Sequence, residues 1–181
     1  MQIWLISDTH HGHENMYRFL RDDGITRVRH QFTDAAEGDA FMVDAWNTVV
    51  KPEDHVWHLG DVGMSRQSLE IVRRLNGKKR LIIGNHDREN MEAYRNVGFQ
   101  KIVGARQFEG LLLTHYPVHP ISISHKVDAN VHGHIHYHPS PPGKYINVSV
   151  EQEHMRYTPI ALEVVQKMAR RLKDEANSMG A

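Results

Sequence analysis

The sequence has no cysteine, no long apolar run and no excess of charge of either sign. The absence of cysteine excludes disulfide bonds and thiolate chemistry, and it fits a reducing compartment. No apolar run approaches the roughly 20 residues that a membrane-spanning helix needs. The first residues also lack the charged start, apolar stretch and cleavage site of a secretory signal. We therefore expect a cytoplasmic protein with no membrane partner.

The charge balance and the length narrow the class of protein further. The 22 basic and 22 acidic residues cancel, which gives no electrostatic argument for a nucleic-acid partner. Basic clusters such as Lys78-Lys79-Arg80 contain no interleaved aromatic residues, so they are poor evidence for nucleic-acid binding as well. The chain has 181 residues, 40% of them hydrophobic, which is enough to bury a sizeable core. We expect a single domain over residues 1–181, and the oligomeric state is left open.

Short aliphatic runs alternate with helical patterns, which is typical of an α/β domain. Strands are predicted at residues 3–6, 56–59, 81–83, 111–114, 130–132, 145–150 and 160–165. Helices are predicted at residues 39–49, 67–75, 89–96 and 164–177. Ser65 is placed to cap the second helix, and Asn76-Gly77 to end it. The polar stretches 11–32 and 115–129 are predicted to be long loops.

Fifteen histidines are the main departure from an ordinary composition. Several lie in short motifs with other metal-binding residue types: Asp8-Thr9-His10, Gly84-Asn85-His86-Asp87 and Gly133-His134-Ile135-His136. Imidazole, carboxylate and amide donors suit manganese, iron or zinc dications better than soft copper(I). Residues two apart in an extended chain point to the same side. Each Asp-x-His or His-x-His pair is therefore expected to reach one small site.

These candidate ligands also share a position relative to the predicted strands. In open α/β sheets the ligand crevice lies beyond the carboxyl ends of the strands. The residues that follow predicted strands at that end are Asp8, His10, Asp61, Asn85, His86, His115 and His134. Any one of them alone is more often a cap or a turn residue. Their shared position predicts a metal centre that is assembled from distant parts of the chain.

Five motifs in order resemble those of the calcineurin-like metallophosphoesterase superfamily. They are Asp8-Thr9-His10, Gly60-Asp61, Gly84-Asn85-His86-Asp87, Thr114-His115-Tyr116-Pro117 and Gly133-His134-Ile135-His136. The resemblance spans residues 8–136, and five ordered motifs are far more specific than one. It implies a four-layer sandwich in which two mixed β-sheets pack face to face and are flanked by helices.

The resemblance also implies a dinuclear metal centre. Its ligands would be Asp8, His10 and His136 for one ion, Asn85, His115 and His134 for the other, and Asp61 as a bridge. A bridging carboxylate holds two cations roughly 3.5 to 4 Å apart, where they clamp the attacking and leaving oxygens of a phosphoryl group. A metal-bridging hydroxide would be the nucleophile. Manganese is the expected ion, and iron, zinc and nickel are the alternatives.

The resemblance gives His86 a catalytic role, in which its imidazole stabilises charge on the phosphate or protonates the leaving oxygen. Many family members carry Gly-Asp-x-x-Asp, whose second carboxylate can orient that histidine. This chain has Met64 at that position, so His86 lacks its expected partner. Asp87 stands where protein phosphatases commonly have glutamate. Both departures argue against a phosphoprotein phosphatase.

Several other histidines have alternative interpretations. His13 and His119 could enter the cleft, although solvent exposure is an equal or better interpretation of each. His58 is expected in the core or beside a metal ligand. His125 is expected at the surface.

These features predict a metal-dependent hydrolase of phosphate esters. Two dications, two carboxylates and one hydroxide leave the centre net positive, which favours an anionic substrate. A small diester or a nucleotide-like compound is the favoured substrate class. The alternatives are a phosphomonoesterase of the same fold and a non-catalytic metal-binding scaffold, which the seven intact ligands disfavour. The residues that bind the rest of the substrate are not identified by the sequence.

Overall fold

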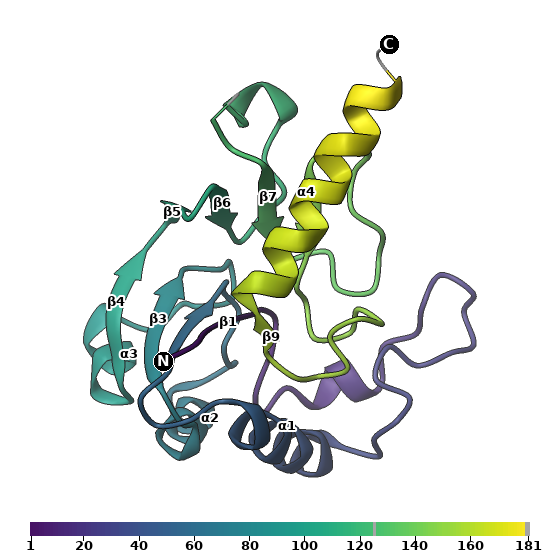
Figure 1. Cartoon of the computed structure of the whole chain (residues 1–181). Coiled ribbons are helices and arrows are strands. Elements are labelled where there is room, and N and C mark those ends of the chain that lie inside the picture. Colours follow the sequence, from purple (N-terminus) through teal and green to yellow (C-terminus); the bar gives the residue numbers. More distant parts are fainter. Residues whose placement is uncertain (125, 180–181) are drawn as a thin grey trace.

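The chain forms two mixed β-sheets flanked by helices (Figure 1), which confirms the predicted α/β class and layer arrangement. The structure, a computed structural model, describes residues 1–124 and 126–179. The surface position expected for His125 therefore lies outside the described residues.

The first sheet contains five strands in the order β4-β3-β2-β1-β9. Its strands are β1 (Ile3–Ile6), β2 (His55–His58), β3 (Lys78–Ile82), β4 (Phe99–Val103) and β9 (Ile160–Ala161). Neighbouring strands run parallel from β4 to β1, and β9 pairs antiparallel with β1. The carboxyl ends of β1, β2 and β3 therefore open on the same edge of the sheet.

The second sheet contains four strands in the order β5-β6-β7-β8. Its strands are β5 (Ala105–Phe108), β6 (Leu111–Thr114), β7 (Ala129–His132) and β8 (Tyr145–Asn147). Strands β6, β7 and β8 are parallel, whereas β5 is antiparallel to β6. A bridge between Ser7 and Ser149 links the segment after β1 to the segment after β8, which joins the two sheets at that point.

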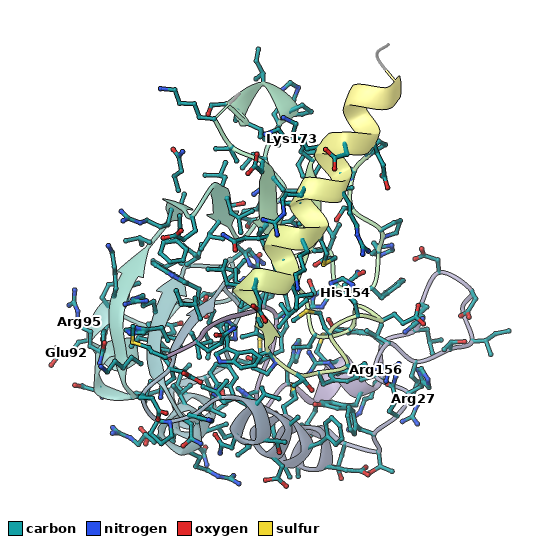
Figure 2. All side chains as sticks on the ribbon, viewed as in Figure 1. Arg27, Glu92, Arg95, His154, Arg156 and Lys173 are labelled. Atoms are coloured by element: carbon teal, nitrogen blue, oxygen red, sulfur yellow. The ribbon has the colours of Figure 1, made fainter. Side chains whose placement is uncertain are left out.

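Helices and short 3-10 turns fill the connections. They are η1 (Glu14–Tyr17), α1 (Ala35–Val49), α2 (Arg66–Leu69), η2 (Glu70–Arg74), α3 (Met91–Asn96), η3 (Pro120–Ser122) and α4 (Leu162–Met179). Helices α1 and α2 lie near each other at the bottom of Figure 1, and α4 begins next to β9 near the middle of the view and runs to the C-terminal end at the top. Lys173 of α4, labelled in Figure 2, donates a hydrogen bond to Asp128 at 2.9 Å. No helix of the described residues is long and apolar enough to cross a bilayer.

One apolar core joins the two sheets. Leu5 and Val56 of the first sheet and Leu113 and Val131 of the second are all fully buried in it. Each such side chain stabilises the fold by about 1.5 to 3 kcal/mol relative to exposure. A second, smaller cluster packs α2 and α3 on the first sheet, and it includes Leu69, Leu81 and Tyr94. Packing on both sides fixes the strands whose ends carry the candidate ligands.

Several predicted boundaries were wrong. Residues 160–165 were predicted to be a strand, but only Ile160–Ala161 are extended, and α4 begins at Leu162. The reason is that Leu162, Val165 and Ala169 recur at helical spacing on a buried face. The strand predicted at 145–150 ends at Asn147, and the helix predicted from residue 39 begins at Ala35.

Strands β4 and β5 were not predicted. The side chains of β5 are mostly exposed, and β4 buries only the phenylalanine at its start. Both are edge strands of their sheets. Neither therefore shows the apolar run or the regular alternation by which a strand is identified from sequence.

The start of α1 gives a test of local stability. Asp34 caps this helix by accepting a hydrogen bond from the Glu37 backbone at 2.9 Å. We expect Asp34→Ala to lower the free energy of unfolding by about 1 kcal/mol, because the amide loses its acceptor. Urea titration measures the change. Asp44→Ala, on the exposed face of the same helix, is the control and should shift stability by less than about 0.5 kcal/mol. Equal effects of the two changes would contradict the role of the cap.

Candidate metal centre

Loops from both sheets bring the candidate ligands together. Asp8 follows β1 and Asp61 follows β2, and their loops are joined by hydrogen bonds from Asp8 N to Gly60 O and from His10 N to Asp61 O, both 3.0 Å. In the second sheet, His115 follows β6, and its carbonyl accepts from Gly133 N at 2.9 Å. Backbone contacts therefore fix the spacing of the loops before any side chain is considered.

The Asp61 carboxylate lies at the middle of the cluster. Its Oδ2 atom is 3.4 Å from His10 Nε2 and also 3.4 Å from His115 Nε2. Its other oxygen, Oδ1, accepts a hydrogen bond from His86 N at 2.8 Å. One carboxylate oxygen near two imidazoles fits a carboxylate that is shared by two cations.

Two overlapping groups of side chains are compact enough to hold a cation. The ligand atoms of Asp8, His10 and His136 lie within 4.8 Å of one another, and so do those of Asp8, Asp61 and His115. Both groups contain imidazole and carboxylate donors, which suit first-row dications. Asp8 belongs to both groups, so the two sites would be adjacent.

His10 gives a direct test of whether a cation fits. The residue is 1% exposed, and neither of its ring nitrogens has a hydrogen-bond partner among the described residues. An unpaired buried polar group costs about 1 to 3 kcal/mol. Burial holds the pKa of His10 well below its usual range, so the ring is neutral and offers a lone pair. A metal ion is the partner that such a nitrogen lacks.

His115 lies among oxygen atoms that can only accept hydrogen bonds. Because His115 Nδ1 lies 2.8 Å from the carbonyl of Leu59, it must carry the proton that this bond requires. Nε2 lies 2.9 Å from Asn85 Oδ1 and 3.4 Å from Asp61 Oδ2. Burial alone would lower the pKa of His115, but the Asp61 carboxylate raises it, so Nε2 can carry a proton that these oxygens accept. These atoms need positive charge among them, either that proton or a cation in its place. The chemistry of these donors therefore fits a bound metal ion.

His134 and His136 lie on different sides of the cluster. The His136 ring is 5.1 Å from the His10 ring, whereas the His134 ring is 5.1 Å from the His115 ring. The backbone N–H of His134 donates to both oxygens of Asp8, at 3.1 and 3.0 Å. The structure thus brings both residues to the centre and separates their side chains.

The backbone is in the left-handed region at five candidate ligands. The φ angles are +60° at Asp8, +47° at His10, +58° at Asp61, +70° at His134 and +49° at His136. Such angles are uncommon in residues other than glycine, and each costs on the order of 1 to 3 kcal/mol. The expectation that each pair lies in an extended segment was therefore wrong. Tight turns beyond the strands direct these side chains inward.

Two glycines allow the loops to approach the carboxylates. A Cβ atom at Gly84 would overlap the side chain of Asp61, and one at Gly133 would overlap those of Ser7 and Asp8. Side chains other than hydrogen are excluded at both positions. This close approach explains why a glycine precedes Asn85 and His134.

A buried ion pair between Arg29 and Glu151 contacts His136 and orients its ring. Arg29 is fully buried and donates two hydrogen bonds to Glu151 Oε1, at 2.9 and 2.7 Å, and one to the Asp8 carbonyl at 2.8 Å. Glu151 Oε2 lies 3.1 Å from His136 Nδ1. Burial alone would lower the pKa of His136, but this carboxylate raises it to about 9. The contact leaves Nε2 of His136 free to face the centre, as carboxylate–histidine pairs do in metal sites.

Sequence reasoning missed Arg29 and Glu151 entirely. Arg29 lies in a polar stretch without periodicity, and its partner is 122 positions away, so no spacing rule connects them. The sequence analysis also did not predict the structural role of Asp87. Its carboxylate accepts from the backbone of Asp61 at 2.8 Å and of Gly84 at 2.8 Å, which ties the loop after β2 to the loop after β3.

His86 lies beside the cluster with a less constrained ring. The ring is 5.2 Å from that of His10, and its nitrogens make no hydrogen bond within the part of the chain that the structure describes. Met64, at the position of the missing carboxylate, is 39% exposed and lines the same cavity as His86. The geometry thus places His86 at the centre without an orienting partner.

The remaining histidines differ in their positions. The His13 ring is 5.5 Å from that of His10 and lines the cavity. His119 is exposed and caps η3 instead. His58 is buried, and its Nε2 lies 3.0 Å from the hydroxyl of Thr9, as expected for a histidine of the core.

Comparison with known proteins identifies the family of this sequence. The sequence profile of the calcineurin-like phosphoesterase superfamily domain matches residues 1–153. An uncharacterized protein of Methanocaldococcus jannaschii, MJ1445, is 29% identical over 178 residues, which cover 92% of this chain and 90% of that protein. The Gene 66 protein of Mycobacterium phage L5 is 34% identical over 103 residues, but these cover only 52% of this chain and 45% of the phage protein.

The chain is also similar to a solved structure. It is a protein of unknown function from Aquifex aeolicus, AQ665, with a TM-score of 0.63 and 26% identity. The match covers 92% of this chain and 98% of that chain. The arrangement of the two sheets is therefore shared over nearly the whole length of both proteins.

The contact between Glu151 and His136 can be tested by a single substitution. We expect Glu151→Gln to weaken manganese binding by about 10- to 100-fold, because His136 loses the carboxylate that orients it. The unfolding free energy should also fall by about 3 kcal/mol or more, since Arg29 is left buried without its counter-charge. Calorimetric titration and urea denaturation measure the two effects.

Glu153→Gln is the matched control, because Glu153 lies two residues away and is exposed. It should change neither property. A folded Glu151→Gln protein with the manganese affinity of the original chain would show that Glu151 has no role in positioning His136.

Proposed function

Because the chain belongs to the calcineurin-like phosphoesterase superfamily, we propose that it is a hydrolase that cleaves phosphate esters at a dinuclear metal centre. The observation that carries the proposal is the position of Asp61 Oδ2, 3.4 Å from the Nε2 atoms of both His10 and His115. Residues 1–181 would form one domain.

The proposed ligands are the seven side chains that the loops bring together. They are Asp8, His10 and His136 for one ion, Asn85, His115 and His134 for the other, and Asp61 for both. Both ions would be divalent, with manganese preferred. When bound, they supply a hydroxide as nucleophile and positive charge for the phosphoryl oxygens. The unpaired nitrogens of His10 and the oxygen atoms grouped around His115 Nε2 support this assignment.

His86 is the proposed catalytic residue of the protein itself. Its ring lines the cavity beside the cluster, so it can donate a hydrogen bond to a phosphate oxygen or to the leaving oxygen. Its backbone is held by Asp61 Oδ1, which keeps the residue at the centre although its ring has no orienting carboxylate.

A phosphodiester is the proposed substrate, either small or nucleotide-like. A cavity of about 940 Å³ opens beside the histidines, which is room for a phosphate with organic groups on both sides. The alternatives are a phosphomonoesterase of the same fold and a non-catalytic metal-binding scaffold.

Turnover of two chromogenic esters distinguishes these functions. With manganese at neutral pH, we expect release of p-nitrophenolate from bis-p-nitrophenyl phosphate, and a lower rate with p-nitrophenyl phosphate. The opposite order of rates would assign the protein to the monoesterases. Manganese-loaded protein that hydrolyses neither ester, nor any of a panel of nucleotides, would be a scaffold.

The bridging role of Asp61 gives a sharper prediction. Asp61→Asn should lower turnover by more than about a hundredfold, since even a residue that only supports a metal ligand can cost that much. Bound manganese should fall from two ions per chain to one or none, as measured by elemental analysis. The fold should persist, because the amide oxygen can still accept from His86 N. The exposed Asp44→Asn is the control. Near-normal turnover by Asp61→Asn would show that the bridge is wrongly assigned.

A further inference from the structure

The cavity beside the proposed metal centre has two chemically different parts. One part is lined by candidate site residues, namely His10, His86, His134 and His136. The other part is apolar and is formed by Met16, Phe19, Leu20, Val28, Ile135 and Tyr137. We call this second set the apolar wall. Phosphate chemistry accounts for the histidines, but it does not account for the apolar wall.

Large apolar side chains of the wall are open to solvent. Phe19 is 48% exposed and Leu20 is 50% exposed. Exposed apolar surface at the mouth of a cavity is typical of a site that binds an organic group. The His13 ring meets the Phe19 ring edge-on, with centroids 6.0 Å apart, so the apolar wall is continuous with the histidine cluster.

Hydrogen bonds hold the segment that carries Phe19 and Leu20 in place. The backbone of Arg21 donates to Thr26 O at 2.7 Å, and that of Val28 donates to Phe19 O at 2.8 Å, which closes a short hairpin. Tyr137, which follows His136 in the chain, donates its hydroxyl hydrogen bond to Asp22 Oδ1 at 2.9 Å. The hairpin is therefore hydrogen-bonded to the segment that contains the proposed ligand His136. The apolar wall is thus an ordered part of the cavity.

The charge of the lining limits what the cavity can bind. Among the described residues that line it, none is lysine or arginine. A second phosphate, or the backbone of a nucleic acid, would need such cations as partners outside the metal centre. The lining thus favours a substrate with a single phosphate and an uncharged organic group.

We propose that the apolar wall binds the organic group of the phosphate ester, and that this group is uncharged and aromatic. The inference rests on the proposed function, because the phosphate must lie at the metal centre for its ester group to reach the wall. Phe19 offers a ring that is about half exposed, whereas the Tyr137 ring is already contacted by Arg21 and His138. Aromatic pairs gain from ring contacts beyond the area that they bury. The wall sets specificity, and it takes no part in the transfer of the phosphoryl group.

Two phosphonates with the same anionic group test the proposal by binding alone. Phenylphosphonate and methylphosphonate differ only in the organic group, and neither is hydrolysed. With manganese-loaded protein, we expect calorimetric titration to give a dissociation constant about tenfold or more lower for phenylphosphonate, because the ring buries apolar area on the wall. Methylphosphonate reports the affinity of the metal centre itself.

A double substitution in the hairpin tests whether the apolar wall causes the preference for phenylphosphonate over methylphosphonate. Phe19→Ala with Leu20→Ala should reduce the advantage of phenylphosphonate to about threefold or less, since most of the exposed wall is removed, and should leave the affinity for methylphosphonate unchanged. Ile25→Ala is the matched control. Ile25 is 82% exposed in the same hairpin and is absent from the cavity lining, so the tenfold preference should persist.

The outcomes separate the failure of this inference from that of the proposed function. Equal affinities for the two phosphonates would overturn the inference and leave the metal centre intact. A phenyl preference that survives the double substitution would overturn it too, because the ring would then bind elsewhere. Manganese-loaded protein that binds neither phosphonate would contradict the proposed function, and the inference would fail with it.

Discussion

Electron-rich atoms face one another at the centre of this protein. Asp61 Oδ2 lies between the Nε2 atoms of His10 and His115, and the amide oxygen of Asn85 points at the same nitrogen of His115. Such groups repel in a buried site unless positive charge lies among them. These groups are held in this arrangement by backbone hydrogen bonds between the loops and by the close approach of the loops at Gly84 and Gly133. The ion pair of Arg29 and Glu151 next to His136 holds them as well. The fold thus favours positive charge at the centre, which protonated imidazoles or bound cations can supply.

Holding the seven candidate ligands in place is costly to the protein. Five of the seven have left-handed backbone conformations, and His10 is buried with unpaired nitrogens. The rest of the structure offsets that cost through a core shared by both sheets and through Arg29, whose guanidinium joins Glu151 to the carbonyl of Asp8. Strained conformations that persist in this way are concentrated at functional sites in proteins.

The sequence was sufficient to locate the strands that carry the ligands. Buried aliphatic runs such as Ile3–Ile6 are unambiguous, and Asp8, His10, Asp61 and His115, which follow such runs, lie close together in the structure. It was not sufficient for contacts that depend on the folded chain. The pairing of Arg29 with Glu151 has no local pattern, and the turns at Asp8 and His134 were mistaken for extended chain. The apolar wall was missed as well, because Phe19 and Tyr137 become neighbours of the site only when the hairpin folds back.

The position of two metal ions is the central claim, and diffraction from crystals grown with manganese tests it most directly. Anomalous scattering at the manganese edge locates the ions without reference to the protein atoms. The account predicts two peaks about 3.5 to 4 Å apart, one on each side of the Asp61 carboxylate. A single peak, or two peaks of which neither contacts Asp61, would contradict it.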